Sequence, residues 1–120
     1  MTALAYAALS GCTAEARLLL QHGADPNLAD NDGNSPLIRA AMASGDAGRG
    51  VAALLLDAEA EIDHQNNIGA TALMFACQNS NVEVARLLLE RGANKDLRDN
   101  DGDGLDFWAD GAAVRKEELL

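Results

Sequence analysis

One short stretch of sequence recurs along the chain, and it predicts a tight turn followed directly by a helix. It occupies residues 30–41 and 66–77, and its helical part alone occupies residues 2–8. In the first full copy, Gly33 suits a turn position with positive φ, Ser35 is a favourable N-cap, and Pro36 falls on the first helical position. Leu37 follows Leu4 by 33 residues and precedes Leu73 by 36. A period near this length indicates one supersecondary unit stacked on its neighbours.

A leucine-rich stretch follows each copy and predicts a second helix. It occupies residues 17–25, 53–61 and 86–94. Two of these copies have a glycine two residues before their end, Gly23 and Gly92, whereas the middle copy has Glu59 at that place. A residue other than glycine in left-handed geometry costs about 1 kcal/mol, so Glu59 is either strained or marks a turn of another shape.

Because both halves of the unit agree in register, the chain resembles the ankyrin repeat, with its Gly-x-Thr-Pro-Leu-His-x-Ala-Ala turn and helix and its Leu-Leu-x-x-Gly-Ala ending. The resemblance implies an all-α helix-turn-helix solenoid of about three and a half repeats, joined by short β-turn or hairpin connections. It implies one domain over residues 1–120, with repeats at about 1–28, 29–63, 64–97 and 98–120, the last a degenerate cap. The usual histidine is replaced by Ala5, Ile38 and Met74, so its hydrogen bonds to the neighbouring turn are expected to be absent.

Three local features refine this prediction. Residues 44–50 lengthen the second unit by three residues and contain three glycines, which indicates a mobile loop. No strand is predicted before this loop and no Gly-Lys-Ser/Thr sequence ends it, so it lacks the pattern of a phosphate-binding loop. Asn81 is a plausible N-cap for the second helix of the third unit.

Residues 112–120, which are more polar than the second helices before them, predict a short final helix that caps the solenoid.

The net charge of −10 argues against nucleic acid and anionic membrane surfaces as partners, because both attract basic faces. It is compatible with a protein partner that has a basic surface, although solubility explains it more simply. The N-terminus lacks a signal-peptide pattern, and no apolar run approaches the length of a membrane span. Cys12 and Cys77 belong to different units, so a disulfide is not expected and a reducing cytoplasm is the expected location.

The sequence contains no pattern of catalytic residues. It has two histidines, His22 and His64, and neither has a nucleophile or a metal-ligand companion at a suitable spacing. We therefore expect a protein that is not an enzyme and that uses no cofactor.

The resemblance points to a partner-binding face made of the turn tips and the first helices, which we call the concave face. The tip candidates are Asn31, Asp32, Asn34, Asn67, Ile68, Asn100 and Asp101. One equivalent position of the first helices holds Tyr6, Arg39, Phe75 and Trp108, and the same helical face continues at Met42, Gln78 and Asn79. Tyrosine, tryptophan and arginine dominate binding hot spots, so this stripe is either a contact surface or packing between helices.

Two other interpretations stay open. Asp99, Asp101, Asp103 and Asp110 match the start and the twelfth position of a calcium-binding loop. However, Asp106 occupies a place that is usually apolar, no helix is predicted directly before Asp99, and residues 30–34 have a similar sequence in an ordinary turn. The third interpretation is a structural scaffold without a specific partner.

Overall fold

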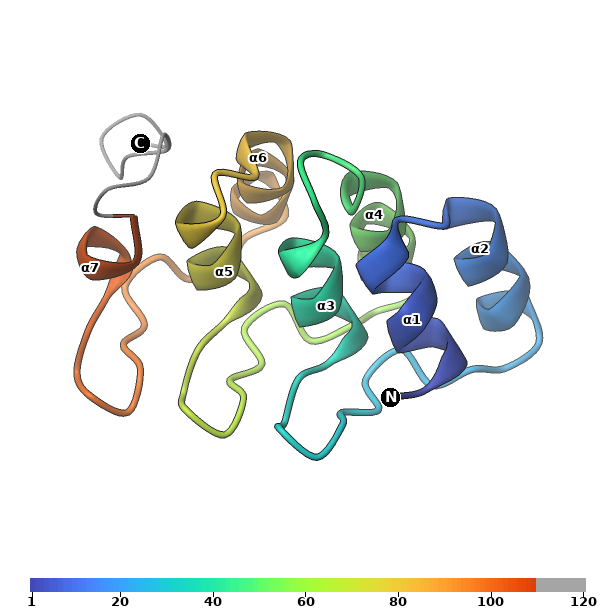
Figure 1. Cartoon of the computed structure of the whole chain (residues 1–120), viewed down its shortest axis with the longest axis horizontal. Helices are drawn as coiled ribbons and strands as arrows, with labels where there is room; N and C mark the ends of the chain where they lie inside the picture. Colours follow the sequence, from blue (N-terminus) through green and yellow to red (C-terminus); the bar gives the residue numbers. More distant parts are fainter. Residues whose placement is uncertain (110–120) are drawn as a thin grey trace.

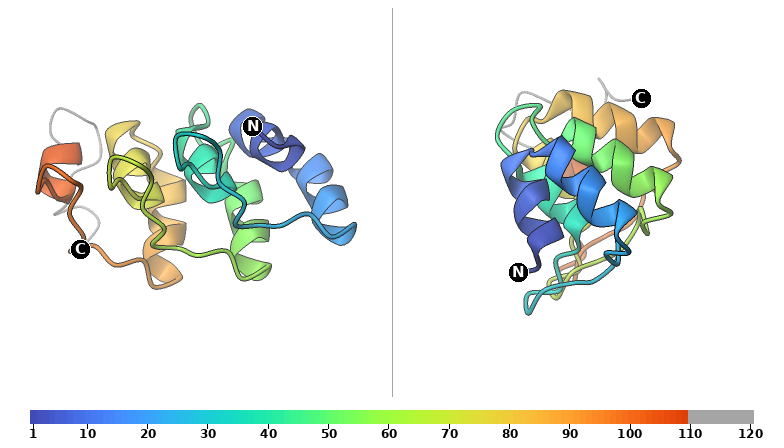
Figure 2. Two further views of the ribbon diagram at one scale, coloured as in Figure 1. Left: turned by 90° about the horizontal axis from the view of Figure 1, so that it is seen from below. Right: turned by 90° about the vertical axis from the view of Figure 1, so that its right-hand side faces the viewer.

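The computed structural model describes residues 1–109, which form helices joined by turns and contain no strand. The helices are α1 (Ala3–Ser10), α2 (Thr13–Gln21), α3 (Pro36–Met42), α4 (Arg49–Asp57), α5 (Ala72–Gln78), α6 (Val82–Glu90) and α7 (Leu105–Ala109). The first helices α1, α3, α5 and α7 form one row, and α2, α4 and α6 form a second row against it (Figures 1 and 2). This arrangement confirms the predicted all-α solenoid. The helix expected over residues 112–120 lies outside the described residues.

The first helices begin at side chains that accept hydrogen bonds from otherwise unpaired backbone N–H groups. The hydroxyl oxygens of Thr2, Ser35 and Thr71 accept from the backbone N–H three residues later, at 3.1, 3.3 and 3.2 Å. These bonds satisfy donors that the start of a helix leaves free, and Pro36 needs no such donor. The starts predicted at Thr2 and Ser35 are therefore confirmed.

Thin layers of alanine and leucine make up the core between the rows. Ala8, Ala41 and Cys77 are fully buried at the same position of successive first helices. Small side chains at this position let the helices approach closely, while Leu37 and Leu73 fill the space towards the second row. Burial raises the pKa of the Cys77 thiol to about 11, so this cysteine acts as a small apolar residue.

The three second helices end alike, including the one with the exceptional residue. Gly23 and Gly92 have φ angles of 89° and 92°, and Glu59 has a φ of 66° at the equivalent place. Glu59 therefore adopts the left-handed geometry instead of changing the turn. A Cβ atom built on Gly23 or Gly92 meets no atom within 4 Å, so only the backbone conformation favours glycine there.

A side chain of the next repeat donates hydrogen bonds to the start of the longer connection between α3 and α4. Asn81 occupies the N-cap position of α6, but its side chain makes no capping hydrogen bond there. Instead, its amide donates to the carbonyl oxygens of Ala41 and Ala43 at 2.6 and 2.9 Å. The predicted N-cap position is thus confirmed, but the side chain serves the carbonyls at the end of α3, which lack helical donors, and not the start of α6.

None of the helices in the described part of the chain is long and apolar enough to cross a membrane.

Candidate functional site

Each turn of the concave face is built around one side chain at its start. The Oδ1 atoms of Asp30, Asn66 and Asp99 each accept the backbone N–H groups two and four residues later. All six distances lie between 2.9 and 3.1 Å. Asp and Asn suit this role because their short side chains reach the backbone of their own turn. The three turns therefore share one conformation.

Hydrogen bonds also join each turn to the next. The Asn67 backbone N–H donates to the Asp32 carbonyl at 3.1 Å, and its side-chain amide donates to the Asn31 carbonyl at 2.9 Å. Asn100 repeats both bonds on Ile68 and Asn67, at 2.9 Å each. The turns consequently form a continuous ladder that projects beyond the ends of the helices (Figure 1).

Glycine lets the turns of this ladder approach so closely. A Cβ atom on Gly33 would lie 2.5 Å from Oδ1 of Asn67, and one on Gly69 would lie 2.5 Å from Oδ1 of Asn100. Both glycines also have positive φ, at 78° and 81°. Two separate physical reasons thus exclude other residues from these places.

Further links between turns come from residues to which the sequence analysis gave no such role. The Nε2 atom of His64 lies 2.8 Å from the carbonyl oxygen of Gly33 in the preceding turn. The Gln65 amide donates to the carbonyls of Gly69 and Arg98 at 2.9 and 3.0 Å. The polar residues directly before the turn were the available signal, although the sequence does not specify the carbonyls that they reach.

The stripe of equivalent first-helix residues is tied to the turns. Nε of Arg39 donates to Oδ2 of Asp30 at 3.1 Å, and Nη2 forms an ion pair with the same oxygen. Nε1 of Trp108 donates to Oδ2 of Asp99 at 3.0 Å. Phe75 has no donor; its ring packs edge-to-face on Trp108, with 5.2 Å between the ring centroids.

These contacts decide the ionisation of the two turn aspartates. Burial raises the pKa of Asp30, but the hydrogen bonds from Arg39 and the turn N–H groups outweigh burial, so the pKa lies below its usual value. The hydrogen bond from the Asp103 backbone N–H is the largest influence on Asp99, and with the Trp108 N–H it also lowers that pKa. Both carboxyl groups are therefore charged at neutral pH, as hydrogen bonding to a carboxylate dictates.

The predicted contact residues divide by exposure. The exposed ones are Asn31, Asp32, Asn67, Ile68, Gln78, Asn79, Asn100 and Asp101. Arg39, Met42 and Phe75 are half-buried, and Arg39 Nη1 lies 3.7 Å from the Met42 sulfur. Asn34 and Trp108 are buried at 5% and 7% exposure, and Asn34 accepts a hydrogen bond from the Asn66 amide. In this stripe, packing thus dominates at Trp108, whereas Tyr6 is open at 57% exposure.

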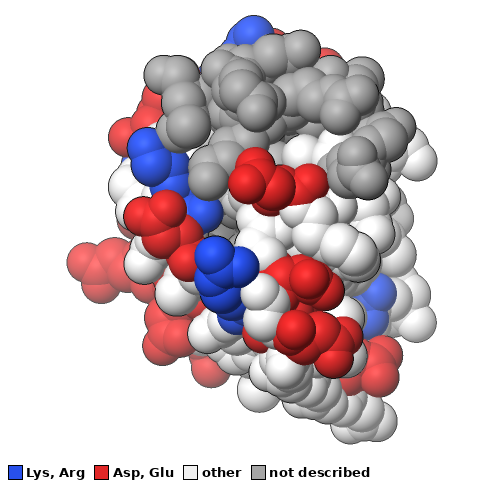
Figure 3. Space-filling view, turned by 90° about the vertical axis from the view of Figure 1, so that its left-hand side faces the viewer, with Lys and Arg blue, Asp and Glu red and all other residues white. Residues whose placement is uncertain are grey.

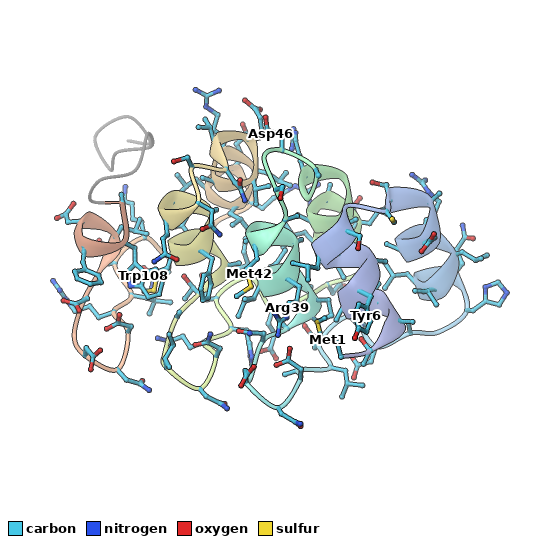
Figure 4. All side chains as sticks on the ribbon, viewed as in Figure 1. Met1, Tyr6, Arg39, Met42, Asp46 and Trp108 are labelled. Carbon is cyan, nitrogen blue, oxygen red and sulfur yellow. The ribbon has the colours of Figure 1, made fainter. Side chains whose placement is uncertain are left out.

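The structure adds one apolar residue that the sequence analysis did not select. The Phe107 side chain is 60% exposed on α7, beside Trp108, with 6.4 Å between the ring centroids. Figure 4 places Tyr6, Arg39, Met42 and Trp108 along the row of first helices, on the side of the molecule facing the viewer. Tyr6 and Ile68 are therefore exposed apolar side chains of the concave face, whereas Phe107 occupies the helix position at which Ile38 and Met74 are buried.

The candidate calcium ligands also lie in a turn. Carboxylate oxygens of Asp99, Asp101 and Asp103 come within 4.8 Å of one another, and Asp110 lies outside the described residues. Oδ1 of Asp99 already accepts two backbone N–H groups, and Oδ2 accepts the Trp108 N–H. The turn at Asp30 has the same bonds, so this conformation is explained without a metal ion.

The described structure has two depressions, one on the second-helix side and one beside the start of α7. One is an open groove of about 350 Å³ between α2 and α4, lined by Arg17, Leu20, Gln21, Leu54, Asp57 and Ala58. The other, of about 120 Å³, lies among residues 95–98 and 104–106. The concave face is instead an extended surface, which suits a polypeptide better than a small molecule.

Comparisons with known proteins give consistent matches. A family model of three ankyrin repeats matches residues 1–66, and a model of the single ankyrin repeat matches residues 68–100. Human neurogenic locus notch homolog protein 2 is 41% identical over 70 residues, which is 58% of this chain. Mouse neurogenic locus notch homolog protein 1 is 35% identical over 83 residues, or 69% of this chain. The matched segments make up 3% of each of these long proteins.

Proposed function

Because the chain belongs to the ankyrin repeat family, we propose that it is a non-enzymatic module that binds a protein partner along its concave face. The family is generally one of protein-interaction modules, and the location of the binding face is our inference. The observation that carries it is the ladder of bonded turns, which fixes the backbone without using the side chains of Asp32, Ile68 and Asp101.

Such a surface binds with little loss of conformational entropy. The turns are already ordered by their own hydrogen bonds, so a partner does not have to order them. Exposed Tyr6 and Ile68 supply apolar area, and the neighbouring polar tips supply hydrogen-bonding groups and charge. Arg39 and Trp108 enter this mechanism mainly as residues that hold the turns in position.

The sharpest test compares two pairs of apolar side chains with matched exposure. Tyr6 and Ile68 are 57% and 55% exposed on the concave face, whereas Leu18 and Leu28 are 56% and 52% exposed elsewhere. Immobilised wild-type protein, Tyr6→Ser/Ile68→Ser and Leu18→Ser/Leu28→Ser are each used to capture proteins from lysate. We expect a protein retained by the wild type and the Leu18/Leu28 variant, and lost by the Tyr6/Ile68 variant.

The outcome depends on folding as well as contact, so circular dichroism must first show that all three proteins have the same helix content. Equal capture by the two variants would move the binding surface away from the concave face. Loss with the Leu18/Leu28 variant alone would place it at the N-terminal repeat. No specific protein in any lane would favour the scaffold interpretation.

We also propose a reducing compartment, such as the cytoplasm, as the location. Cys12 and Cys77 are both free thiols, and Cys77 is buried where oxidation cannot reach it without opening the fold. Fractionation of cells that express the tagged chain tests this proposal directly.

A further inference from the structure

Charge is distributed unequally between the two sides of the solenoid. The basic residues of α2, α4 and α6 and of the segment after α6 are Arg17, Arg49, Arg86, Arg91, Lys95 and Arg98. Arg86 and Arg91 form ion pairs there with Glu83 and Asp57. Figure 3 views the end that carries α7 and shows basic side chains interspersed with acidic ones over much of the described surface. The second-helix side is therefore of mixed charge.

The concave face has no exposed basic side chain within residues 1–10, 30–42, 66–79 and 99–109. Its one cation in these ranges, Arg39, has a side chain only 17% exposed and is paired with Asp30. Arg98 directly precedes the last turn, where its exposed guanidinium donates to the Gly102 carbonyl and places one positive charge beside Asp101. The three aspartates of that turn, Asp99, Asp101 and Asp103, outnumber this one arginine, so the turn keeps a negative net charge.

The tips themselves form a row with a regular pattern. Asp32, Ile68 and Asp101 each occupy the place directly before the turn glycine, and all three are exposed. Within the described chain, no ion pair neutralises Asp32 or Asp101. Their side chains also accept none of the hydrogen bonds that build the turns, since Asp30, Asn66 and Asp99 do so. The row thus presents an acidic, an apolar and an acidic side chain on a fixed backbone.

From this arrangement we propose that the concave face selects a basic polypeptide segment, with lysine or arginine side chains on either side of an apolar one. The proposal rests on the binding function proposed above and names the chemistry of its partner. Adjacent repeats are separated by the roughly 10 Å of packed helices, so Asp32 and Asp101 lie about 20 Å apart. An extended segment covers that distance in about six residues.

Complementary charge in such a site acts mainly on specificity and on the rate of association. Two unpaired carboxylates attract basic segments and repel acidic ones, while Ile68 contributes apolar burial between them. Salt should weaken the interaction, because exposed charges are screened within about 10 Å at 0.1 M ionic strength. On the second-helix side, acidic side chains alternate with basic ones, and Glu83 and Asp57 are already paired with arginines.

A random library of displayed peptides of about twelve residues tests the proposal without a known partner, since that length spans the row in an extended conformation. It is selected in parallel on wild-type protein, on Asp32→Asn/Asp101→Asn and on Glu15→Gln/Glu90→Gln. The last variant removes the same total charge from exposed positions of α2 and α6. Asparagine at the tips preserves shape and leaves the turn hydrogen bonds intact.

We expect the wild type and the Glu15/Glu90 variant to enrich peptides that carry lysine or arginine around an apolar residue. The Asp32/Asp101 variant should bind those peptides about tenfold less tightly and show a weaker dependence on salt. Enrichment of neutral or acidic peptides would overturn the basic specificity, and so would basic peptides that bind both variants equally. In either case, peptides whose binding is lost in the Tyr6→Ser/Ile68→Ser variant would leave the proposed function standing. If no peptide is enriched on any of the proteins, the basic specificity and the proposed function are both contradicted.

Discussion

The turn that begins at Asp30 and the turn that begins at Asn66 have the same backbone conformation. They differ in the first-helix residue nine positions later, because Arg39 donates hydrogen bonds to Asp30 and Phe75 cannot donate to Asn66. Asp30 accepts two turn N–H groups and also pairs with Arg39. Asn66 accepts the same two N–H groups, but Phe75 offers it no donor. The Asn66 amide instead donates to Asn34 in the preceding turn at 2.8 Å.

The turn at Asp99 shows that this difference follows a rule. There, Trp108 stands nine residues later and supplies an N–H, and the first residue of the turn is again an aspartate. A carboxylate has two oxygens that accept, so it serves the turn with one and the helix with the other. An amide has one acceptor and one donor group, so it suits the unit whose helix brings no donor. In each of these units, the first residue of the turn is therefore an aspartate where the residue nine positions later is a donor, and an asparagine where it is not.

The largest effect should come from removing the shared acceptor of the first of these turns. Asp30→Ala deletes two turn bonds and leaves the half-buried Arg39 guanidinium without its partner, which should lower the free energy of unfolding by about 3 kcal/mol. Asn66→Ala deletes bonds between neutral groups only and should cost about 1–2 kcal/mol. Urea unfolding followed by circular dichroism measures both. Equal losses would mean that the ion pair adds nothing to the turn.

A double-mutant cycle tests the matching itself. Asp30→Asn and Arg39→Phe together give the second unit the pair found in the third, Asn66 and Phe75. The double variant should be more stable than the sum of the single losses predicts, with a coupling of about 1 kcal/mol for residues in direct contact. Additive losses within the error of urea unfolding would contradict a matched pair. Asn66→Asp, which removes the bond to Asn34, serves as the converse exchange.

Acid should narrow the difference between the two kinds of turn. The pKa of Asp30 in the folded protein lies below its usual value, so the unfolded chain takes up this proton first as the pH falls. The stability that Asp30 contributes is complete above the unfolded pKa of about 4 and is lost as the pH falls through the folded pKa. Wild type and Asp30→Asn should therefore differ in stability at pH 7 and converge towards pH 3. A constant gap in urea midpoints over that range would contradict this assignment.

Much of this fold is predictable because the determinants of the repeat are local. Gly33, Ser35 and Pro36 each favour one backbone conformation, so the sequence alone located the turn and the start of α3. Cys77 could be assigned to the core because its position is alanine in the other units. Local reasoning also placed Asn81 correctly at the N-cap of α6, but it did not show that the side chain bonds the end of α3, about 40 residues away in sequence.

The candidate face was harder to predict, because exposure depends on pairings between units. The sequence placed Arg39, Phe75 and Trp108 on one stripe, but their spacing did not reveal that Asp30 and Asp99 hold two of them. Asn34 looked like an exposed tip residue and is buried against the next turn. Residues such as these acquire their roles from the neighbouring repeat, so no pattern within one repeat reports them.

The smallest expected effect concerns the end of the second repeat, the one that contains Asp30, where Glu59 replaces glycine. Its φ of 66° is a conformation that glycine adopts freely and that other residues adopt at a penalty of about 1 kcal/mol. Glu59→Gly should therefore stabilise the protein by that amount and raise the melting temperature by about 4 °C. Glu59→Gln controls for the lost charge and should leave the temperature unchanged.

Gly92→Ala is the reverse experiment in the next unit. Its φ of 92° disfavours alanine, and a Cβ atom there meets nothing within 4 Å, so the melting temperature should fall through backbone strain alone. Opposite shifts of similar size would show that the two turns have the same intrinsic preference. A lower melting temperature for Glu59→Gly would instead mean that the glutamate side chain stabilises this turn by more than its backbone strain.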